Sequence, residues 1–238
     1  MQVNLDKIYI CHHKKLVNRK NNLMMFFNKH GIDVEWVEKY PPEDILEQYN
    51  SMKYSIDDKN TELFYHMCAQ LCLNKIKRCD FNLPHNIGKK ITLSELSLYL
   101  KHKYCLEDQL QNKYRNILIL EDDVILDDNF ITYINRNLEE FDLSDSDILI
   151  VGETPQWNYV PINYSSNKLI HYSENQLTRC AHAIIYKLDV VKNIIDEIRN
   201  ITFQWDFKLN EIMIKKNLRV SWSCPGILQG NQTSSIKK

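Results

Sequence analysis

Three consecutive acidic residues, Glu121, Asp122 and Asp123, follow the apolar run "NILIL" that begins at residue 116. Successive side chains of an extended chain point to opposite faces, so Glu121 and Asp123 would face one way and Asp122 the other. Three buried charges without compensation are very unfavourable, so the acids must meet solvent or a cation where the strand ends. Carboxylates suit Mg²⁺ or Mn²⁺, which keep positions open for substrate phosphates. The pattern indicates a metal–diphosphate site; the alternative is a solvated strand end beside the positive N-terminus of the next helix.

Strands alternate with helices along the chain, and this order would place the acids at the edge of a sheet. Periodicity and breakers predict strands at 7–11, 32–38, 116–120, 146–153, 180–186 and 218–226, and helices at 16–31, 61–79, 92–114, 127–141, 188–199 and 205–217. A short helix is expected after the proline pair at 41–42, and loops at 51–60 and 154–168. Ligands of open α/β sheets bind at the carboxyl ends of strands. We therefore predict one α/β domain over residues 1–238, a sandwich around a mainly parallel sheet with the acids at its carboxyl edge.

The composition is that of a globular chain without a strong overall charge. Its 238 residues are 44% hydrophobic with a formal net charge of −1, which argues against disorder and gives no field that favours nucleic acid or membranes. The sequence start lacks the features of a signal peptide, and no apolar run is long enough for a membrane span. Seven scattered cysteines indicate reduced thiols. We expect a soluble protein of cytoplasmic type that binds no nucleic acid; the composition leaves its oligomeric state open.

Three segments resemble glycosyltransferase family 25, which includes lipooligosaccharide galactosyltransferases and collagen hydroxylysine glycosyltransferases. In residues 92–126 the family pattern is a Gly-Glu helix start, a Ser-His pair and an apolar strand that ends in Glu-Asp-Asp-Val. The corresponding residues here are Ser94-Glu95, Lys101-His102 and the intact Glu121-Asp122-Asp123-Val124. Residues 8–33 resemble the family's opening segment, with Arg19 as its arginine, and residues 203–236 resemble the closing segment, with Asp206, Pro225 and Gln229. The bias toward Asn, Lys and Ile best fits the collagen-modifying members found in giant viruses.

This resemblance implies a GT-A fold, a nucleotide-sugar donor that is usually a UDP-sugar, and often Mn²⁺. Asp123 is then the first choice for the metal ligand, joined by Asp122, while Glu121 or Asp122 contacts the ribose or a metal-bound water. The metal would neutralise the departing diphosphate as a Lewis acid. His12, His13, Lys14 and Arg19 follow the first strand, and this segment would lie against the base and the diphosphate. Gln229 follows the last strand and would contact the metal or the diphosphate. Taken singly, each of these five also fits a plain solvated loop.

Two carboxylates are candidates for the acceptor side of the reaction. Asp206 lies at the start of a predicted helix, where it would orient or deprotonate the acceptor hydroxyl or else cap the helix. Glu153, at the end of the strand 146–153, is the other candidate. Both positions are compatible with an inverting or a retaining outcome. His102 is expected to be a supporting histidine, and His182, in a buried strand, is a weaker candidate for the site.

The expected activity is transfer of a hexose from UDP-glucose or UDP-galactose to a hydroxyl group. Hydroxylysine or galactosylhydroxylysine of a collagen-like protein is the favoured acceptor, and a lipooligosaccharide or another glycan is the alternative. A non-catalytic nucleotide-sugar or glycan-binding module is the alternative of another class, which the departures at Ser94 and Lys101 keep open. A phosphohydrolase fits less well, because the sequence has no second acidic motif on a neighbouring strand.

Overall fold

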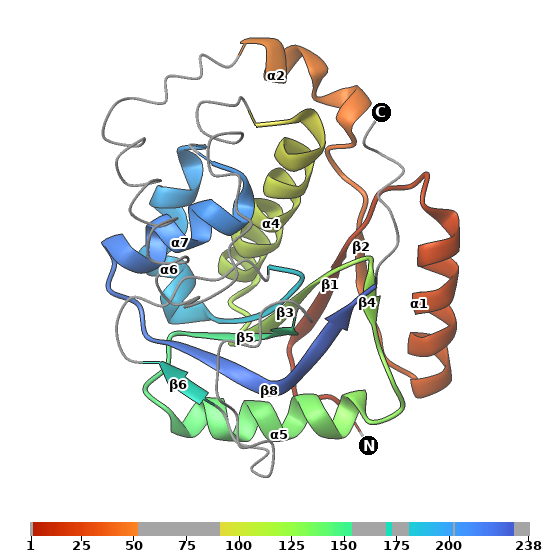
Figure 1. The fold of residues 1–238 in the computed structure, drawn as a ribbon, viewed down its shortest axis with the longest axis vertical. Helices are drawn as coiled ribbons and strands as arrows, with labels where there is room; N and C mark the ends of the chain where they lie inside the picture. The colour runs from red at the N-terminus through yellow and green to blue at the C-terminus, as the bar shows by residue number, and fades with distance from the viewer. Residues whose placement is uncertain (1, 52–90, 154–169, 173–180, 202, 231–238) are drawn as a thin grey trace, which may run out of the picture.

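One sheet of eight strands organises the described part of the protein. The computed structural model describes residues 2–51, 91–153, 170–172, 181–201 and 203–230, so the predictions for 52–90 and 154–168 lie outside this part of the chain. The strand order is β2-β1-β3-β7-β5-β8-β4, and β6 pairs with β8 (Figure 1). The strands are β1 (Lys7–Cys11), β2 (Glu35–Val37), β3 (Asn116–Glu121), β4 (Val124–Ile125), β5 (Ile148–Glu153), β6 (Ile170–Tyr172), β7 (Ala183–Lys187) and β8 (Val220–Gln229).

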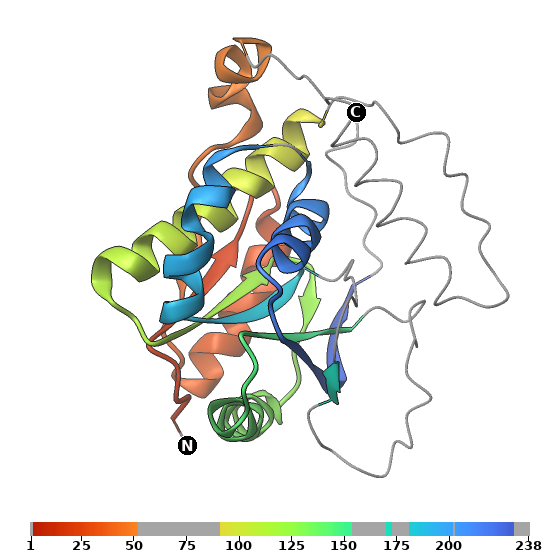
Figure 2. The ribbon, with the colours of Figure 1, turned by 90° about the vertical axis from the view of Figure 1, so that its left-hand side faces the viewer.

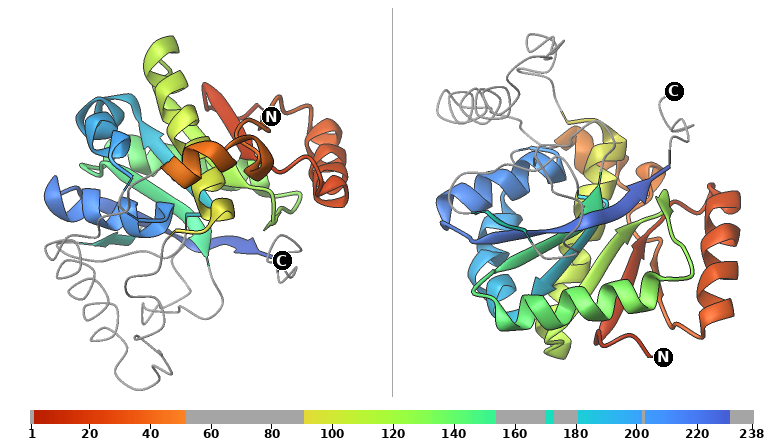
Figure 3. Two further views of the ribbon diagram at one scale, coloured as in Figure 1. Left: turned by 90° about the horizontal axis from the view of Figure 1, so that it is seen from above. Right: turned by 60° about the horizontal axis from the view of Figure 1, so that its bottom comes forward.

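Helices cover both faces of this sheet. They are α1 (Val17–His30), the short 3-10 helix η1 (Pro42–Asp44), α2 (Leu46–Ser51), α4 (Leu93–Asn112), α5 (Phe130–Leu143), α6 (Leu188–Arg199) and α7 (Trp205–Lys215). α4, α6 and α7 cover one face, and α1 and α5 cover the other (Figure 2 and Figure 3). Their side chains form two hydrophobic clusters with those of the sheet, one on each face. Residues 117–120 of β3 are fully buried because both faces are covered, which explains the unbroken apolar run before the acids.

The strand directions agree with the predicted fold. β1 pairs in parallel with β2 and β3, and β5 pairs in parallel with β8. β7 lies antiparallel between β3 and β5, so β2, β1, β3, β5 and β8 all run one way, whereas β7, β4 and β6 run against them. The α/β prediction with a mainly parallel sheet is therefore confirmed, and the architecture is consistent with a GT-A-like fold.

The predicted elements differ from the structure mainly around β8. The strands β4 and β6 were not predicted, because two and three residues are too few to show periodicity. β8 continues to Gln229, beyond the predicted stop at 226. The register between β5 and β8 is irregular. Ile150 of β5 pairs with Trp222 of β8, but Gly152, two residues later, pairs with Ile227, five residues later in β8. Pro225 lies in this irregularity, where no ladder hydrogen bond is required of it.

Local signals set the helix ends that the sequence suggested. The side chain of Thr92 accepts a hydrogen bond from the Glu95 backbone, and the Glu95 carboxylate accepts one from the Thr92 backbone, so a capping box starts α4. Gly31 ends α1 in the left-handed conformation, with φ of 61°. The sequence signals at Thr92 and Gly31 thus set the start of α4 and the end of α1.

Candidate active site

The carboxyl ends of β1 and β3 and the end of β8 meet at one place. Cys11, the last residue of β1, pairs with Glu121, the last residue of β3. Val124 of β4 pairs with Gln229, and the N–H of Gly230 donates to the Asp123 carbonyl at 2.7 Å. The loop after β1, the acids and the end of β8 are thus brought together although they lie about a hundred residues apart in the sequence.

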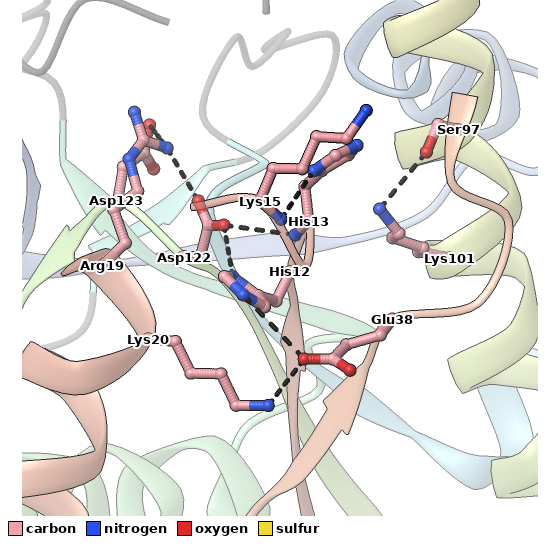
Figure 4. Close-up of polar contacts among 10 residues, drawn as sticks. All are labelled: His12, His13, Lys15, Arg19, Lys20, Glu38, Ser97, Lys101, Asp122 and Asp123. Atoms are coloured by element: carbon pink, nitrogen blue, oxygen red, sulfur yellow. Dashed lines mark hydrogen bonds and ion pairs between the residues drawn. The ribbon is translucent and has the colours of Figure 1, made fainter. Parts of the chain in front are cut away.

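Asp122 is held by two side chains and one backbone N–H. Arg19 Nη1 donates to Asp122 Oδ1 at 2.7 Å, and His12 Nδ1 lies 2.7 Å from Asp122 Oδ2 (Figure 4). The His13 backbone N–H donates to the same Oδ2 at 3.4 Å. Burial raises the pKa of the Asp122 carboxyl, but the hydrogen bonds from His12 and Arg19 outweigh it and hold the pKa below the ordinary value. Asp122 therefore stays ionised in the buried position that it occupies.

Asp123 lies in the turn after β3, next to the same guanidinium. Gln229 Nε2 donates to Asp123 Oδ1 and Oδ2 at 3.3 and 3.2 Å, and Arg19 Nη1 lies 3.7 Å from Asp123 Oδ2. Burial raises the pKa of the Asp123 carboxyl, and the negative charge of Asp122 adds to this effect. This carboxylate is less compensated than Asp122, so an added cation would gain most by binding here.

Glu121 faces the side of the sheet that α4 and α7 cover, as the alternation of the strand predicts. Its Oε1 lies 3.9 Å from His102 Nε2, and the His102 ring stacks on Trp205 with 4.8 Å between the ring centroids. Burial raises the pKa of Glu121 to about 7, with Asp123 the next contribution. Burial lowers the pKa of His102 to about 3, so this histidine is neutral. The three adjacent acids thus have different protonation behaviour, set by the partners of each one. Asp123, expected on the same side as Glu121, instead shares Arg19 with Asp122, because it lies in the turn after the strand.

The raised pKa of Glu121 predicts how metal-free stability depends on pH. The folded chain keeps the Glu121 proton up to about pH 7, whereas the unfolded chain loses it near 4.5. Unfolding then releases a proton in this window, so stability falls as pH rises through it, by about 3 kcal/mol in all. Glu121→Gln removes this titration. In EDTA, the melting temperature of the variant is expected to exceed that of wild type by more at pH 8 than at pH 4.5. A gain that is the same at both pH values would contradict the assignment.

The loop after β1 places its predicted residues unequally. His13 is buried, and its Nε2 lies 3.6 Å from Glu43 Oε2. Lys14 is exposed, and its Nζ lies 3.8 Å from Glu43 Oε1. The structure therefore brings His12, His13 and Arg19 to the acids, while Lys14 lies with Glu43 of η1 at the rim.

Two further charged residues at this edge were missed by the sequence analysis. Lys20 Nζ donates to Glu38 Oε1 at 2.6 Å and lies over the Trp36 ring, and Glu38 Oε1 is 3.9 Å from His12 Nε2. Glu38 directly follows β2, and that position at a strand end is the signal that would have found it. These contacts connect β2 and α1 to the histidine that holds Asp122.

The two predicted acceptor-side carboxylates lie on different elements. Asp206 is half-buried in the first turn of α7, whose N-cap is Gln204 and has no side-chain capping bond, so Asp206 is not the helix cap. The backbone of Glu153 ends β5 and pairs with Leu228, which pairs on its other side with Ile125. Glu153 therefore ends its strand at the same edge as the acids, one strand removed from β4.

His182 lies next to the acids, close enough to influence the pKa values of Glu121 and Asp123. Its carbonyl accepts the Glu121 N–H at 2.8 Å, and its Nε2 lies 2.9 Å from the Ile227 carbonyl oxygen. Gly152 makes room for the ring, because a Cβ added there would lie 2.6 Å from His182 Nε2. His182, directly before β7, thus contacts β3 through its backbone and β8 through its ring.

Substitution of Gly152 is therefore expected to destabilise the protein. Gly152→Ala forces the His182 ring or the β5 backbone to move, which costs about 1–3 kcal/mol of unfolding free energy in a packed interior. Urea unfolding measures the loss, and the double variant Gly152→Ala/His182→Ala should recover part of it because the ring is gone. A Gly152→Ala protein with wild-type stability would show that this contact does not constrain the fold.

The side chains at this edge fit one kind of metal site. In the described part of the chain, no group of three or more His, Cys, Asp and Glu side chains is arranged to hold a metal ion. Mg²⁺ and chemically similar ions are commonly bound through one or two carboxylates together with substrate phosphates, and not by a cage of protein ligands. Asp123, with Asp122 beside it, fits that second arrangement: an oxygen site that a diphosphate completes.

Comparison with known proteins identifies the family. Residues 5–203 match the family model described as "Glycosyltransferase family 25 (LPS biosynthesis protein)". The chain belongs to glycosyltransferase family 25. This glycosyltransferase is also similar to a solved structure, "crystal structure of a glycosyltransferase involved in the glycosylation of the major capsid of PBCV-1", with 13% identity, a TM-score of 0.39, and coverage of 91% of this chain and 80% of that one. The search of curated proteins gave no match.

Membership of this family decides the class of reaction. The protein is a glycosyltransferase, and a nucleotide-sugar donor and an acceptor are its expected substrates. None of the helices in the described ranges is long and apolar enough to cross a membrane. The acids, the loop after β1 and Gln229 lie together in this glycosyltransferase, and their assignment to a donor site stays a prediction.

Proposed function

We propose that this glycosyltransferase moves a hexose from a UDP-sugar to a hydroxyl acceptor with the help of Mn²⁺ or Mg²⁺. One observation carries the proposal: Asp122 and Asp123, at the carboxyl end of β3, share the Arg19 guanidinium. In the reaction the bond between the sugar C1 and the diphosphate oxygen breaks, and UDP leaves with the bonding electrons. A bond forms between C1 and the acceptor oxygen, and the hydroxyl proton passes to a base.

The residues of the chain divide this work between donor and acceptor. A metal bound at Asp123 and Asp122 would supply Lewis-acid stabilisation of the leaving diphosphate. Arg19 moves part of its hydrogen bonding from the acids to the diphosphate, to which a guanidinium is well matched. Gln229 holds the Asp123 carboxylate in place from β8. His12 and the ionised Asp122 orient one another, which fixes the loop after β1 against the nucleotide.

Asp206 and Glu153 are proposed for the acceptor side. A carboxylate within hydrogen-bonding reach of the acceptor hydroxyl orients it and accepts its proton, a contribution of about 10²–10⁴-fold. We expect Asp206→Asn or Glu153→Gln to lower kcat by that order while the affinity for UDP stays within about twofold of wild type. Steady-state kinetics with saturating donor measures this effect. Unchanged kcat and acceptor KM in both variants would exclude both residues.

The acceptor that we favour is hydroxylysine or galactosylhydroxylysine of a collagen-like polypeptide, with UDP-glucose or UDP-galactose as donor. The bias of the sequence toward Asn, Lys and Ile, which best fits the collagen-modifying members of the family, supports this choice. A lipooligosaccharide or another glycan is the second candidate, and the family description, which names LPS biosynthesis, favours it. We also propose that residues 1–238 form a single domain, which the continuous sheet from β2 to β4 supports.

A UDP-release assay tests the proposed function. The protein is incubated with UDP-glucose, UDP-galactose and other UDP-sugars in Mn²⁺, with and without hydroxylysine-containing collagen peptides or lipooligosaccharide. Release that requires a collagen peptide supports the favoured acceptor, and release that requires the glycan supports the second candidate. Binding of UDP without release from any pair would indicate the non-catalytic module, and no dependence on a divalent ion would contradict the metal proposal.

A further inference from the structure

Lys101 of α4 is a buried cation with little compensation in the described chain. Its side chain is 4% exposed, and its Nζ donates to Ser97 Oγ at 3.2 Å. Ser97 in turn donates to the Tyr40 carbonyl at 2.6 Å. An ammonium group has three N–H donors and no acceptor, so two of the donors face no protein oxygen within the described ranges. Lys208, the other buried lysine there, instead donates to Glu211 Oε2 at 2.9 Å.

The lysine reaches toward the carboxyl ends of β1 and β2. Figure 4 shows Lys101 extending from α4 toward the loop that carries His13 and Lys15. Burial lowers its pKa, and the nearby groups Cys11, Asp122, Glu38 and Glu43 raise it in part. Burial lowers the pKa of His13 as well, and the charge of Lys101 adds to that. The ammonium therefore lies between the strand ends and η1, on the side of the sheet that α4 covers, away from α1 and Arg19.

The charges around Lys101 favour a neutral ligand over a phosphate. The carboxylates of Glu38 and Glu43 raise the pKa of Lys101, so they lie close enough to its ammonium group to repel an anionic ligand that binds beside it. A ring that offers both C=O and N–H groups suits an ammonium flanked by carboxylates. Uracil is such a ring, whereas adenine has no carbonyl oxygen. The diphosphate is already accounted for by the acids and Arg19.

We propose that Lys101 determines donor specificity by donating a hydrogen bond to a carbonyl oxygen of the pyrimidine base. This inference rests on the proposed function, since it takes a UDP-sugar as the donor. The family pattern has serine at this position, so the contact is a property of this chain and not of the resemblance. The buried ammonium is unfavourable without ligand, and the base supplies the acceptor that the described chain does not.

Binding measurements with three probes test the assignment. The affinities for UDP, ADP and inorganic pyrophosphate are measured by calorimetry in Mn²⁺ for wild type, Lys101→Met and Lys101→Gln. Lys101→Met should weaken UDP binding about ten- to hundredfold, the effect of one lost hydrogen bond to a charged group, and leave ADP and pyrophosphate within about twofold. Lys101→Gln, which keeps a donor, should lose less. Lys192→Met removes one positive charge from α6, at a side chain that is 56% exposed and pairs with Asp189, and should change none of the three affinities.

The ligand-free melting temperature separates this role from a purely structural one. Lys101→Met removes a poorly compensated buried charge, so its melting temperature should equal or exceed that of wild type while UDP affinity falls. An equal loss of affinity for all three probes would overturn the proposal in favour of a phosphate contact. If Lys101→Met instead melts at a lower temperature and keeps the wild-type preference for UDP over ADP, the proposal is overturned. Lys101 would then have a structural role, in which it supports the contact between α4 and the loop at Tyr40. If wild type binds no UDP at all, the proposed function fails first, and this inference fails with it.

Discussion

Asp123→Asn is expected to lower transfer by on the order of a thousandfold while the fold is kept. The substitution keeps the size of the side chain and leaves an amide oxygen to accept from Gln229, but it removes the charge that a divalent ion would bind. Loss of one preorganised electrostatic group at a developing charge lowers rates by about 10²–10³-fold, and loss of the metal removes more. The kcat/KM for UDP-sugar with Mn²⁺ measures the effect.

A matched control separates this effect from a general change of charge. Asp128→Asn makes the same substitution five residues further along, at an exposed side chain that pairs with Lys29. It should keep nearly full activity. Because burial raises the pKa of Asp123, the Asp123→Asn protein should melt no lower than wild type at neutral pH. Near-normal activity of Asp123→Asn, or a loss equal to that of the control, would exclude Asp123 as the metal ligand.

Arg19→Met is expected to lower both stability and activity. Among the described residues, this leaves Asp122, whose side chain is 9% exposed, with His12 and a backbone N–H to compensate its charge. Removing one partner of a buried ion pair costs about 3–5 kcal/mol, which corresponds to a fall of roughly 6–20 °C in melting temperature for a chain of this size. Activity should fall further than stability explains, since the guanidinium is also the proposed diphosphate contact.

The chain offers a control pair with the same contact distance. Arg199 Nη1 lies 2.7 Å from Asp196 Oδ1, the same distance as in the Arg19 pair, but both side chains are exposed. Arg199→Met should cost less than about 1 kcal/mol, as exposed pairs do. The double variant Arg19→Met/Asp122→Asn should recover part of the stability of Arg19→Met because no buried charge is left unpaired. Equal losses in the Arg19→Met and Arg199→Met proteins would show that burial of the first pair does not matter.

The sequence allowed the elements that carry the site to be predicted, because their signals are local. The apolar run before Glu121, the cap at Thr92 and the stop at Gly31 each depend on a few neighbouring residues, and the structure confirms all three. The alternation of side chains also placed Glu121 and Asp122 on opposite faces. The short strands β4 and β6 gave no such signal, since their existence depends on pairing with β8.

The electrostatics of the site depended on contacts that a sequence does not show. Glu121 and Asp122 are neighbours with similar side chains, yet their pKa values move in opposite directions. The difference arises because Arg19 and His12 reach one face of β3, while Trp205 and a neutral His102 cover the other. The Lys20–Glu38 pair and the burial of Lys101 likewise follow from how α1 and α4 pack, which local patterns do not determine. Gln229 was found only through the family resemblance.

The central claim is that Asp122 and Asp123 hold a divalent ion against the diphosphate of a nucleotide sugar. Crystals grown with Mn²⁺ and UDP test it most directly, because anomalous scattering identifies the metal position. The account predicts a manganese peak within coordination distance of an Asp123 carboxylate oxygen, with the UDP diphosphate oxygens on its other side and Arg19 turned toward them. A map with UDP bound elsewhere, or with no manganese at the end of β3, would contradict it.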